Sequence, residues 1–231
     1  MVEMSVMVFA AGFGKRMGAL TKDRPKPLLK VCGLPLIDHA LALTNGIDKR
    51  YVVVNTHYKH EMLKAHLFKA PIKINLEFPD ILETGGGLKA ALPMLQTNPV
   101  VTLNSDAVWA GKNPLQELIS HWDSSRMDAL LLCIPPARRY GYKGSGDFLI
   151  NAQGVLCREG DLVYSGAQII KTGLLGQIDD KAFSLNRLWD FMLKKKTLFG
   201  MIYSGRWCDV GTPEGIIEAE HMFLKKTLND Q

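Results

Sequence analysis

The chain has 231 residues, of which 47% are hydrophobic and 22% charged, and its 28 basic and 23 acidic residues give a net charge of +5. These values argue against disorder and leave room for one domain whose core needs no disulfides. A positive charge could suit nucleic acid, an anionic surface or a polyphosphate substrate, but the basic residues are scattered along the chain.

No apolar run approaches the ~20 residues of a membrane span. The apolar start of the chain lacks the basic region and the cleavage site of a signal peptide. Cysteines stand at positions 32, 133, 157 and 208 without a CxxC pair, which indicates neither a zinc site nor a disulfide framework. We therefore expect a cytoplasmic protein with reduced thiols and with neither membrane nor nucleic acid among its partners.

Short apolar runs alternate with helical patterns through the first half of the chain. Strands are predicted at 4–10, 51–55, 72–76, 100–103 and 129–134, and helices at 36–43, 60–68, 88–95 and 114–122. This alternation predicts a mostly parallel sheet with helices on both faces.

The pattern changes after two consecutive prolines. Residues 138–170 carry short strand-like runs and many glycines, which is typical of an inserted β region, and helices return at 184–195 and 213–225. We expect one α/β domain over residues 1–231, with the added strands in its second half.

A glycine-rich segment follows the first predicted strand. Glycines at this point let the backbone approach a phosphate closely. The segment lacks the third glycine of a dinucleotide fingerprint, because Met17 stands there, and it lacks the Ser or Thr of a Walker loop, because Arg16 stands there. A plain turn is the alternative to a phosphate site. The candidate phosphate-binding residues are Ala11, Gly12, Gly14, Lys15 and Arg16.

A lysine between two prolines comes next, in the run Pro25-Lys26-Pro27. The prolines fix the local backbone, so Lys26 carries an aimed charge. Its ammonium can act on a phosphate as a point charge, whereas Arg16 can grip phosphate oxygens in a bidentate fashion. The alternative is an ordinary surface lysine. In either case we expect Lys26 to be exposed and to contribute little to stability.

Together these segments resemble the signature of sugar-1-phosphate nucleotidyltransferases. The resemblance extends over nearly the whole chain, through AAGFGKRM at 10–17, PKP at 25–27, ETGGG at 83–87, NSD at 104–106 and WCDVGT at 207–212. It implies a single-domain, Rossmann-like fold of the GT-A type. It also implies transfer of a nucleotidyl group from a nucleoside triphosphate to a sugar 1-phosphate, with release of pyrophosphate.

The resemblance makes Arg16 and Lys26 catalytic and makes Asp106 and Asp209 the ligands of Mg²⁺, with Asp106 also at the nucleotide. Asp106 follows a buried strand, and ligands of open α/β sheets bind at that end of strands. A helix cap or turn is the alternative for Asp106, and a loop aspartate before a helix is the alternative for Asp209. Two carboxylates suffice for magnesium, because phosphates and waters complete its shell.

The resemblance also assigns residues to the base and to the sugar. Gly85 and Gly86 would lie against the base, for which a flexible linker is the alternative. Asn55 would face the base or merely cap its strand. The sugar-side residues would be Asp147, Ser165 and Gly166, for which a hairpin turn and an edge strand are the alternatives.

Within the family, the chain most resembles the enzymes that join UTP to N-acetylmuramate 1-phosphate in peptidoglycan recycling. Its end, soon after the segment that holds Asp209, is expected to exclude an appended acyltransferase domain. Mannose-1-phosphate guanylyltransferases are the main alternative, and enzymes that transfer a thymidylyl or cytidylyl group are a second. A third alternative is a non-catalytic module that binds a nucleotide sugar. Ser105 replaces a usual glycine and is expected to be accommodated. Ser145 stands where the uridylyl enzymes usually have Arg, which could relax sugar selection.

Overall fold

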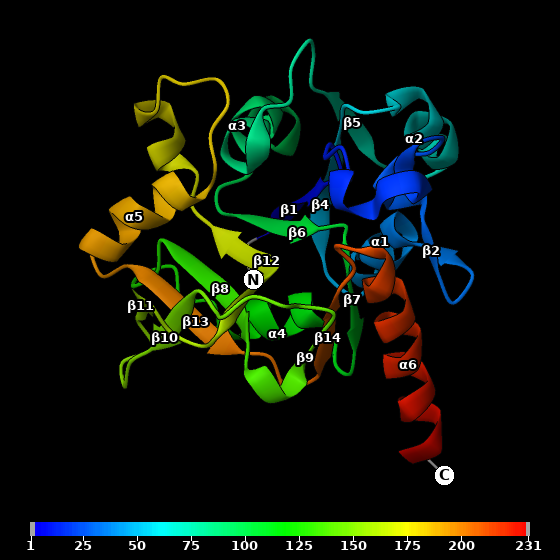
Figure 1. Cartoon of the computed structure of the whole chain (residues 1–231). Coiled ribbons are helices and arrows are strands. Elements are labelled where there is room, and N and C mark those ends of the chain that lie inside the picture. The colour runs from blue at the N-terminus through cyan, green and yellow to red at the C-terminus, as the bar shows by residue number, and fades with distance from the viewer. Residues whose placement is uncertain (1–2, 230–231) are drawn as a thin grey trace.

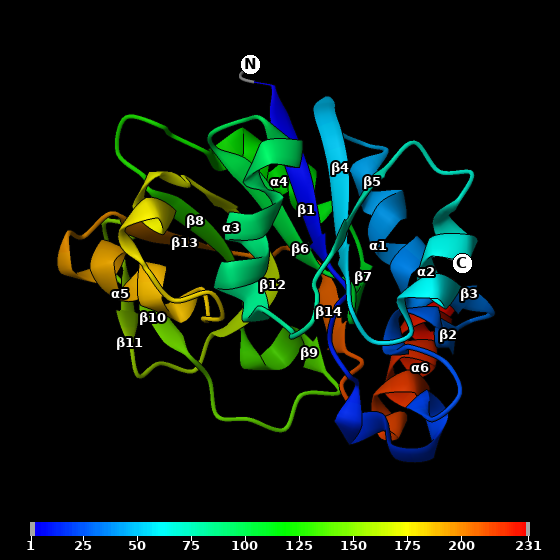
Figure 2. The ribbon, with the colours of Figure 1, turned by 90° about the horizontal axis from the view of Figure 1, so that it is seen from above.

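A computed structural model describes residues 3–229 of the chain (Figure 1). Its centre is a seven-stranded sheet. The strands are β1 (Met4–Phe9), β4 (Lys49–Thr56), β5 (Lys73–Leu76), β6 (Val100–Asn104), β8 (Ala129–Ile134), β12 (Val163–Ile170) and β13 (Leu198–Ile202). Their order is β13-β8-β12-β6-β1-β4-β5, which runs from left to right in Figure 2.

One strand runs against the others. β1 pairs in parallel with β4 and β6, β4 with β5, and β8 with β13, whereas β12 is antiparallel to both β6 and β8. The carboxyl ends of β1, β4 and β6 therefore meet the amino end of β12 at one edge of the sheet. This is the edge at which open α/β sheets bind ligands.

Helices cover both faces of the sheet, as predicted. The helices α1 (Leu36–Thr44), α2 (His60–Leu67) and α4 (Pro114–His121) pack into one hydrophobic cluster. The helices α3 (Glu83–Leu95) and α5 (Asn186–Lys194) pack into a second cluster on the opposite face, and α3 crosses in front of the strands in Figure 2. Alternate residues of each strand enter one cluster or the other, as the pleat of a buried strand requires. The mostly parallel α/β fold is confirmed.

A small sheet extends the fold beside the last helix, α6 (Pro213–Asn229). It consists of β7 (Ala107–Ala110), β14 (Arg206–Asp209) and β9 (Arg139–Tyr140), in the order β7-β14-β9. The strands β7, β13 and β14 are absent from the sequence prediction, because they are short and their apolar runs carry no clear alternation.

Residues 138–170 do not form one inserted unit. β9 joins the small sheet, β10 (Phe148–Ile150) and β11 (Leu156–Arg158) form a separate hairpin, and β12 is a central strand of the main sheet. Two further short strands, β2 (Lys30–Val31) and β3 (Leu34–Pro35), form another hairpin. The β12 register shifts between Tyr164 and Gln168, which breaks the period that would have marked a long strand.

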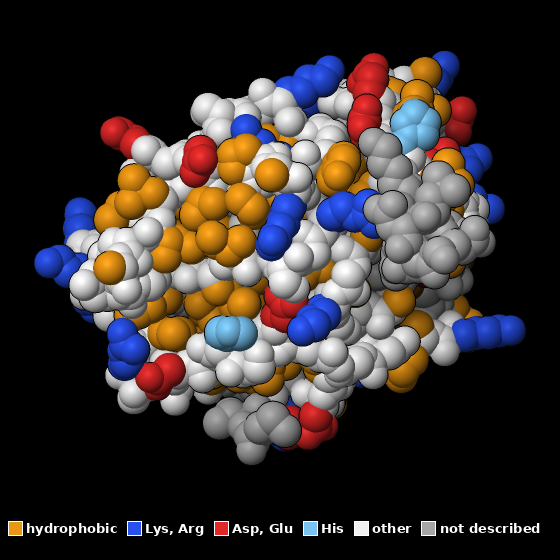
Figure 3. Space-filling view, turned by 90° about the horizontal axis from the view of Figure 1, so that it is seen from below, with side chains coloured by type: hydrophobic (Ala, Val, Ile, Leu, Met, Phe, Trp, Pro, Cys, Tyr) orange, Lys and Arg blue, Asp and Glu red, His pale blue; other side chains and the backbone are white. Residues whose placement is uncertain are grey.

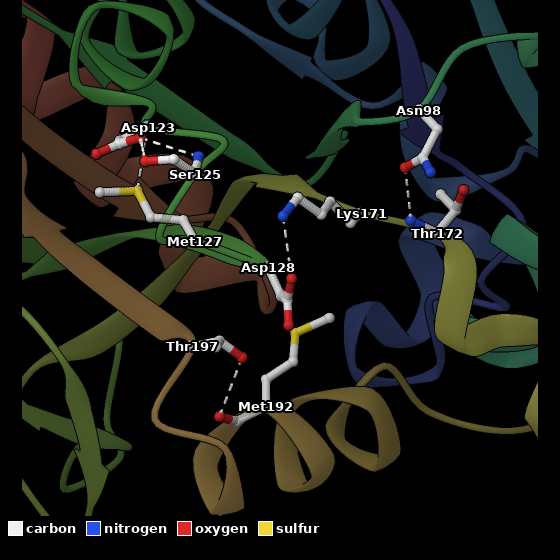
Figure 4. A network of polar contacts seen from close by, with 9 residues as sticks. All are labelled: Asn98, Asp123, Ser125, Met127, Asp128, Lys171, Thr172, Met192 and Thr197. Atoms are coloured by element: carbon white, nitrogen blue, oxygen red, sulfur yellow. Dashed lines mark hydrogen bonds and ion pairs between the residues drawn. The ribbon is translucent and has the colours of Figure 1, made fainter.

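Polar contacts link the strands at the edge of the sheet opposite the carboxyl ends of β1, β4 and β6 (Figure 4). Lys171 donates to Asp128 Oδ1 over 3.1 Å, and the amide of Thr172 donates to Asn98 Oδ1 over 2.9 Å. These contacts link the end of β12 to the starts of β8 and β6. The polar groups at this edge are thus paired with one another, and we look for a ligand site at the opposite edge, where β1, β4 and β6 end.

The charged side chains on the face seen in Figure 3 are dispersed. Lysines and arginines stand singly around a hydrophobic area and form no continuous basic surface on this face. Within residues 3–229, no helix combines the length and the apolarity that crossing a bilayer demands.

Candidate active site

A cleft, here called the main cleft, opens at the carboxyl ends of β1, β4 and β6. Five of the predicted site residues line it, and they are Ala11, Gly12, Lys26, Asn55 and Asp106. The other lining residues come from the ends of β1 and β6, the segment around Lys26, the segment after β5 and the start of α3, and they are Phe9, Ala10, Pro27, Glu77, Ile81, Glu83, Thr84, Asn104 and Ser105. The predicted nucleotide residues Gly14, Lys15, Arg16, Gly85 and Gly86 lie outside these walls.

The glycine-rich segment combines an open position with a tightly packed one. A Cβ on Gly12 would meet nothing within 4 Å, so a ligand can approach the backbone there. Gly14 has φ of 65°, and a Cβ there would lie 2.9 Å from Cβ of Lys26. Only glycine suits that conformation and that approach. The segment continues as the 3₁₀ helix η1 (Lys15–Thr21), whose Lys15 and Arg16 are exposed.

Lys26 is buried, and the expectation of an exposed lysine is wrong. Its side chain is only 11% exposed, because the segment around Gly14 packs against its aliphatic part. Pro25 is extended and Pro27 occupies the first turn of the short 3₁₀ helix η2 (Lys26–Leu28), which aims the lysine into the cleft. Its Nζ lies 2.8 Å from Asp106 Oδ2.

Ser105 fits where the family usually has glycine, as expected. Its amide and its hydroxyl both donate to the Phe9 carbonyl, over 3.2 and 2.7 Å. Ser105 thereby fastens the end of β6 to the end of β1. The turn that follows presents Asp106 to the cleft.

Strand pairing brings Asp209 beside Asp106. β14 runs antiparallel to β7 with Asp209 opposite Ala107, and the amide of Val210 donates to the Asp106 carbonyl over 2.8 Å. The two predicted metal ligands are thus neighbours at one end of the β7–β14 pair. Arg16 reaches the same place, since a Cβ on Gly211 would lie 2.9 Å from both Arg16 Nη2 and Asp209 Oδ2.

The two carboxylates differ in their electrostatic surroundings. Burial pushes the pKa of Asp106 upward, but the charge and hydrogen bond of Lys26, helped by Arg16, outweigh it and leave this pKa below its usual value. Burial and the charge of Asp106 raise the pKa of Asp209 to about 6, against a smaller opposing effect of Lys26 and Arg16. Asp209 therefore carries a negative charge that the protein itself does not balance.

The donor set suits a hard cation. Asp106 and Asp209 offer only oxygen, and among the described residues no group of three His, Cys, Asp or Glu side chains is placed to hold a metal. Magnesium is commonly bound through one or two carboxylates, with phosphate oxygens and waters as its other ligands. The unbalanced charge of Asp209 fits such a role.

The glycine run at 83–87 is the first turn of α3 and not a loop ahead of the helix. The amides of Gly85 and Gly86 donate to the Phe183 carbonyl over 2.8 and 3.1 Å. A Cβ on either glycine would clash with the segment around Phe183. Their backbone thus serves a close packing contact, and the preceding Glu83 and Thr84 face the main cleft.

A buried network closes one end of the cleft. Asn55 accepts from the Ala10 amide over 2.7 Å and donates to Glu77 Oε1 over 2.6 Å, while Glu77 Oε2 accepts from the Leu82 amide over 2.7 Å. Glu77 is only 1% exposed. The sequence analysis missed it, although a carboxylate directly after the alternating strand at 72–76 was the available signal.

A second cavity, here called the side hollow, adjoins the main cleft and shares Thr84 and Asn104 with it. Of the three predicted sugar-side residues, Asp147 lines the side hollow and accepts from the Tyr164 amide over 2.9 Å. Ser165 is 1% exposed, and Gly166 packs against Asn104. These two residues lie behind the walls. The side hollow is otherwise lined by Phe148, Arg158, Tyr164, Ser184, Leu185, Asn186 and Trp189.

Fold, cleft and comparisons together define a nucleotidyltransferase. The family model of the MobA-like NTP transferase domain matches residues 6–163. N-acetylmuramate alpha-1-phosphate uridylyltransferase from Caulobacter vibrioides is 36% identical over 230 residues, which cover 93% of this chain and 94% of that protein. The chain belongs to the MobA-like NTP transferase family, and it is a sugar-1-phosphate nucleotidyltransferase.

More distant similarities agree with this assignment. Mannose-1-phosphate guanylyltransferase catalytic subunit beta from Danio rerio is 25% identical over 239 residues, which cover 96% of this chain and 65% of that protein. The crystal structure of HddC from Yersinia pseudotuberculosis complexed with GMP-PN has a TM-score of 0.76 at 20% identity, covering 95% of this chain and 99% of that one. The second similarity shows the shared fold.

The contrast between the two aspartates predicts opposite effects on stability. Because the folded-state pKa of Asp209 is raised to about 6, the folded state loses stability as the pH rises from the usual carboxyl pKa of about 4 to about 6. The cost is complete above about pH 6 and small near pH 4. Asp209→Asn should therefore stabilise the metal-free protein by about 1–2 kcal/mol at about pH 7.5, and not at about pH 4. Urea unfolding in the presence of a chelator measures this.

Asp106→Asn is the matched control. The pKa of Asp106 is lowered, so the charge of this carboxylate stabilises the folded state. The substitution also leaves buried Lys26 without its partner. This variant should lose stability at about pH 7.5. Equal losses in both variants at neutral pH would contradict the assigned charge balance.

Proposed function

We propose that the protein transfers the uridylyl group of UTP to N-acetylmuramate 1-phosphate and that the reaction depends on Mg²⁺. The observation that carries the reaction is the convergence of Lys26, Asp106, Asp209 and Arg16 beside the main cleft, whose walls include Lys26 and Asp106. The choice of base and sugar is supported by the relative that is 36% identical and matches along almost its whole length.

The proposed step is an in-line displacement. A phosphate oxygen of the sugar 1-phosphate attacks the α-phosphorus of UTP, a new P–O bond forms, and the bond to the leaving pyrophosphate breaks. Such a transfer needs positioning and charge stabilisation more than covalent help. No protein nucleophile takes part in the proposed step.

The residues divide the work by position. The open backbone at Gly12 and the exposed cations Lys15 and Arg16 would receive the β- and γ-phosphates. Lys26 is held immobile between its prolines and Asp106, so its charge can act at the α-phosphate without reorganisation. Asp106 and Asp209 would hold Mg²⁺, which supplies positive charge to the phosphates of both substrates.

The two cavities suit the two substrates. The base would lie toward the end of the main cleft closed by Asn55 and Glu77, and the sugar would occupy the side hollow next to Asp147. Ser145 is exposed and lies outside the walls of both cavities. The alternative sugar, mannose 1-phosphate, rests on the weaker similarity of 25%.

A substrate panel tests the proposed function. Four nucleoside triphosphates are combined with N-acetylmuramate, N-acetylglucosamine, glucose and mannose 1-phosphates, and pyrophosphate release gives kcat/KM for each pair. UTP with N-acetylmuramate 1-phosphate should lead every other pair by at least roughly tenfold, the scale on which pocket shape discriminates. A lead for GTP with mannose 1-phosphate would overturn the uridylyl assignment and leave the reaction class intact.

Metal dependence has its own test. A chelator should abolish turnover, and Mg²⁺ should restore it. Asp209→Asn should raise the Mg²⁺ concentration for half-maximal activity by roughly tenfold or more, because a charged ligand is lost while the shape is kept. Asp23→Asn, at an exposed position outside the main cleft, is the control. Titrations of Asp209→Asn that overlay those of the native protein would place the metal elsewhere.

Lys26→Met tests the aimed charge while retaining most of the buried aliphatic volume. Turnover should fall by ~10²–10³, as expected for the loss of one preorganised charge-stabilising group. Unfolding curves must accompany the kinetics, because this lysine is buried and paired. Lys22→Met, at an exposed site on the same segment, should keep normal turnover. Normal turnover in Lys26→Met would refute its role.

A further inference from the structure

We propose that Arg158 recognises a carboxylate on the sugar 1-phosphate, so that the enzyme prefers an acidic sugar over its neutral parent. The inference rests on the proposed function, in which the side hollow receives the sugar. N-acetylmuramate differs from N-acetylglucosamine by a lactyl ether that ends in a carboxylate. A chain that prefers the first sugar needs a group that detects this carboxylate.

The side hollow is placed to receive the sugar end of the acceptor. It shares Thr84 and Asn104 with the main cleft, and Asn104 stands two positions before Asp106. A sugar in the side hollow would thus have its phosphate toward the aspartates and its far side toward the opposite wall. Arg158, on β11, belongs to the walls of the side hollow and is the only lysine or arginine among them.

The guanidinium of Arg158 is held in a defined orientation. Its Nη2 donates to Asn186 Oδ1 over 2.9 Å and to Asp190 Oδ1 over 2.8 Å, both on α5. Its central carbon lies 4.8 Å from the centre of the Phe148 ring, and Phe148 is fully buried. Within residues 3–229 these are the polar and ring contacts of the group, so its Nη1 and Nε hydrogens remain available to a ligand.

A purely structural role explains this arrangement less well. The side chains of Arg158 and Asp190 are 36% and 57% exposed, and ion pairs this exposed contribute little to stability. An arginine fixed in place beside a cavity, however, binds a carboxylate with little loss of side-chain entropy. Asp147, the other charged residue of the side hollow, accepts from the Tyr164 amide, which holds its carboxylate in place.

The test compares two sugars that differ only in the lactyl group. With UTP, N-acetylmuramate 1-phosphate and N-acetylglucosamine 1-phosphate are assayed on the native protein and on Arg158→Gln, Arg158→Lys and Asp190→Asn. Arg158→Gln should raise KM for the acidic sugar roughly 10–100-fold, the scale of a charged hydrogen bond. KM for UTP and kcat/KM for the neutral sugar should stay within about twofold. Arg158→Lys should recover part of the loss.

Asp190→Asn separates recognition from support. It removes the negative charge of the partner on α5 but keeps an amide oxygen that can accept from Nη2, and the contact with Asn186 stays, so the guanidinium remains oriented and the preference for the acidic sugar should be retained. Equal losses on both sugars in Arg158→Gln, or the same change in Asp190→Asn, would overturn the inference in favour of a structural role. An unchanged KM for the acidic sugar in Arg158→Gln would also overturn it. A native protein that uses neither sugar with UTP would overturn the proposed function itself, before any variant is compared.

Discussion

The site depends on one ion pair, between the buried Lys26 and the partly exposed Asp106. A lysine that is 11% exposed must find a counter-charge, and the 2.8 Å contact supplies it. The pair joins the loop after β1 to the end of β6, so the first glycine-rich segment and the central sheet hold one geometry. It also keeps the ammonium in the cleft, ready for an anionic ligand that competes for its charge.

The ion pair between Lys26 and Asp106 leaves the second carboxylate, Asp209, without a counter-charge of its own. Asp209 ends β14 and Asp106 directly precedes β7, yet only Asp106 receives the lysine, and the pKa of Asp209 rises to about 6 through burial and the charge of its neighbour. The fold thus retains a charge that destabilises it. Such a cost is characteristic of functional sites, in which a bound cation can restore the balance.

The residues at the carboxyl ends of β1, β4 and β6 could be predicted from the sequence better than the segments that pack around them. The strands that end at the cleft have long apolar runs, and the glycines, Lys26 and the aspartates stand in recognisable order around them. β12 escaped prediction as a sheet strand because its irregular register breaks the pattern, and its antiparallel place depends on contacts far along the chain. The burial of Lys26 also arises from tertiary packing, against Gly14. The glycines at 85 and 86 lie against the segment around Phe183, a long-range contact that local sequence does not encode.

The positions that the sequence missed share a physical reason. Glu77 follows a short strand and Arg158 is the last residue of another. Neither belongs to a motif, and their roles depend on which distant groups they contact. Glu77 links the ends of two strands to the start of α3, because Asn55 and the Leu82 amide both donate to its carboxylate. Arg158 is oriented because α5 and the Phe148 ring hold one side of its guanidinium, which leaves its other hydrogens available. The shared catalytic groups can therefore lie in motifs near the strand ends, while the groups that distinguish one substrate from another depend on how the second half of the chain folds around them.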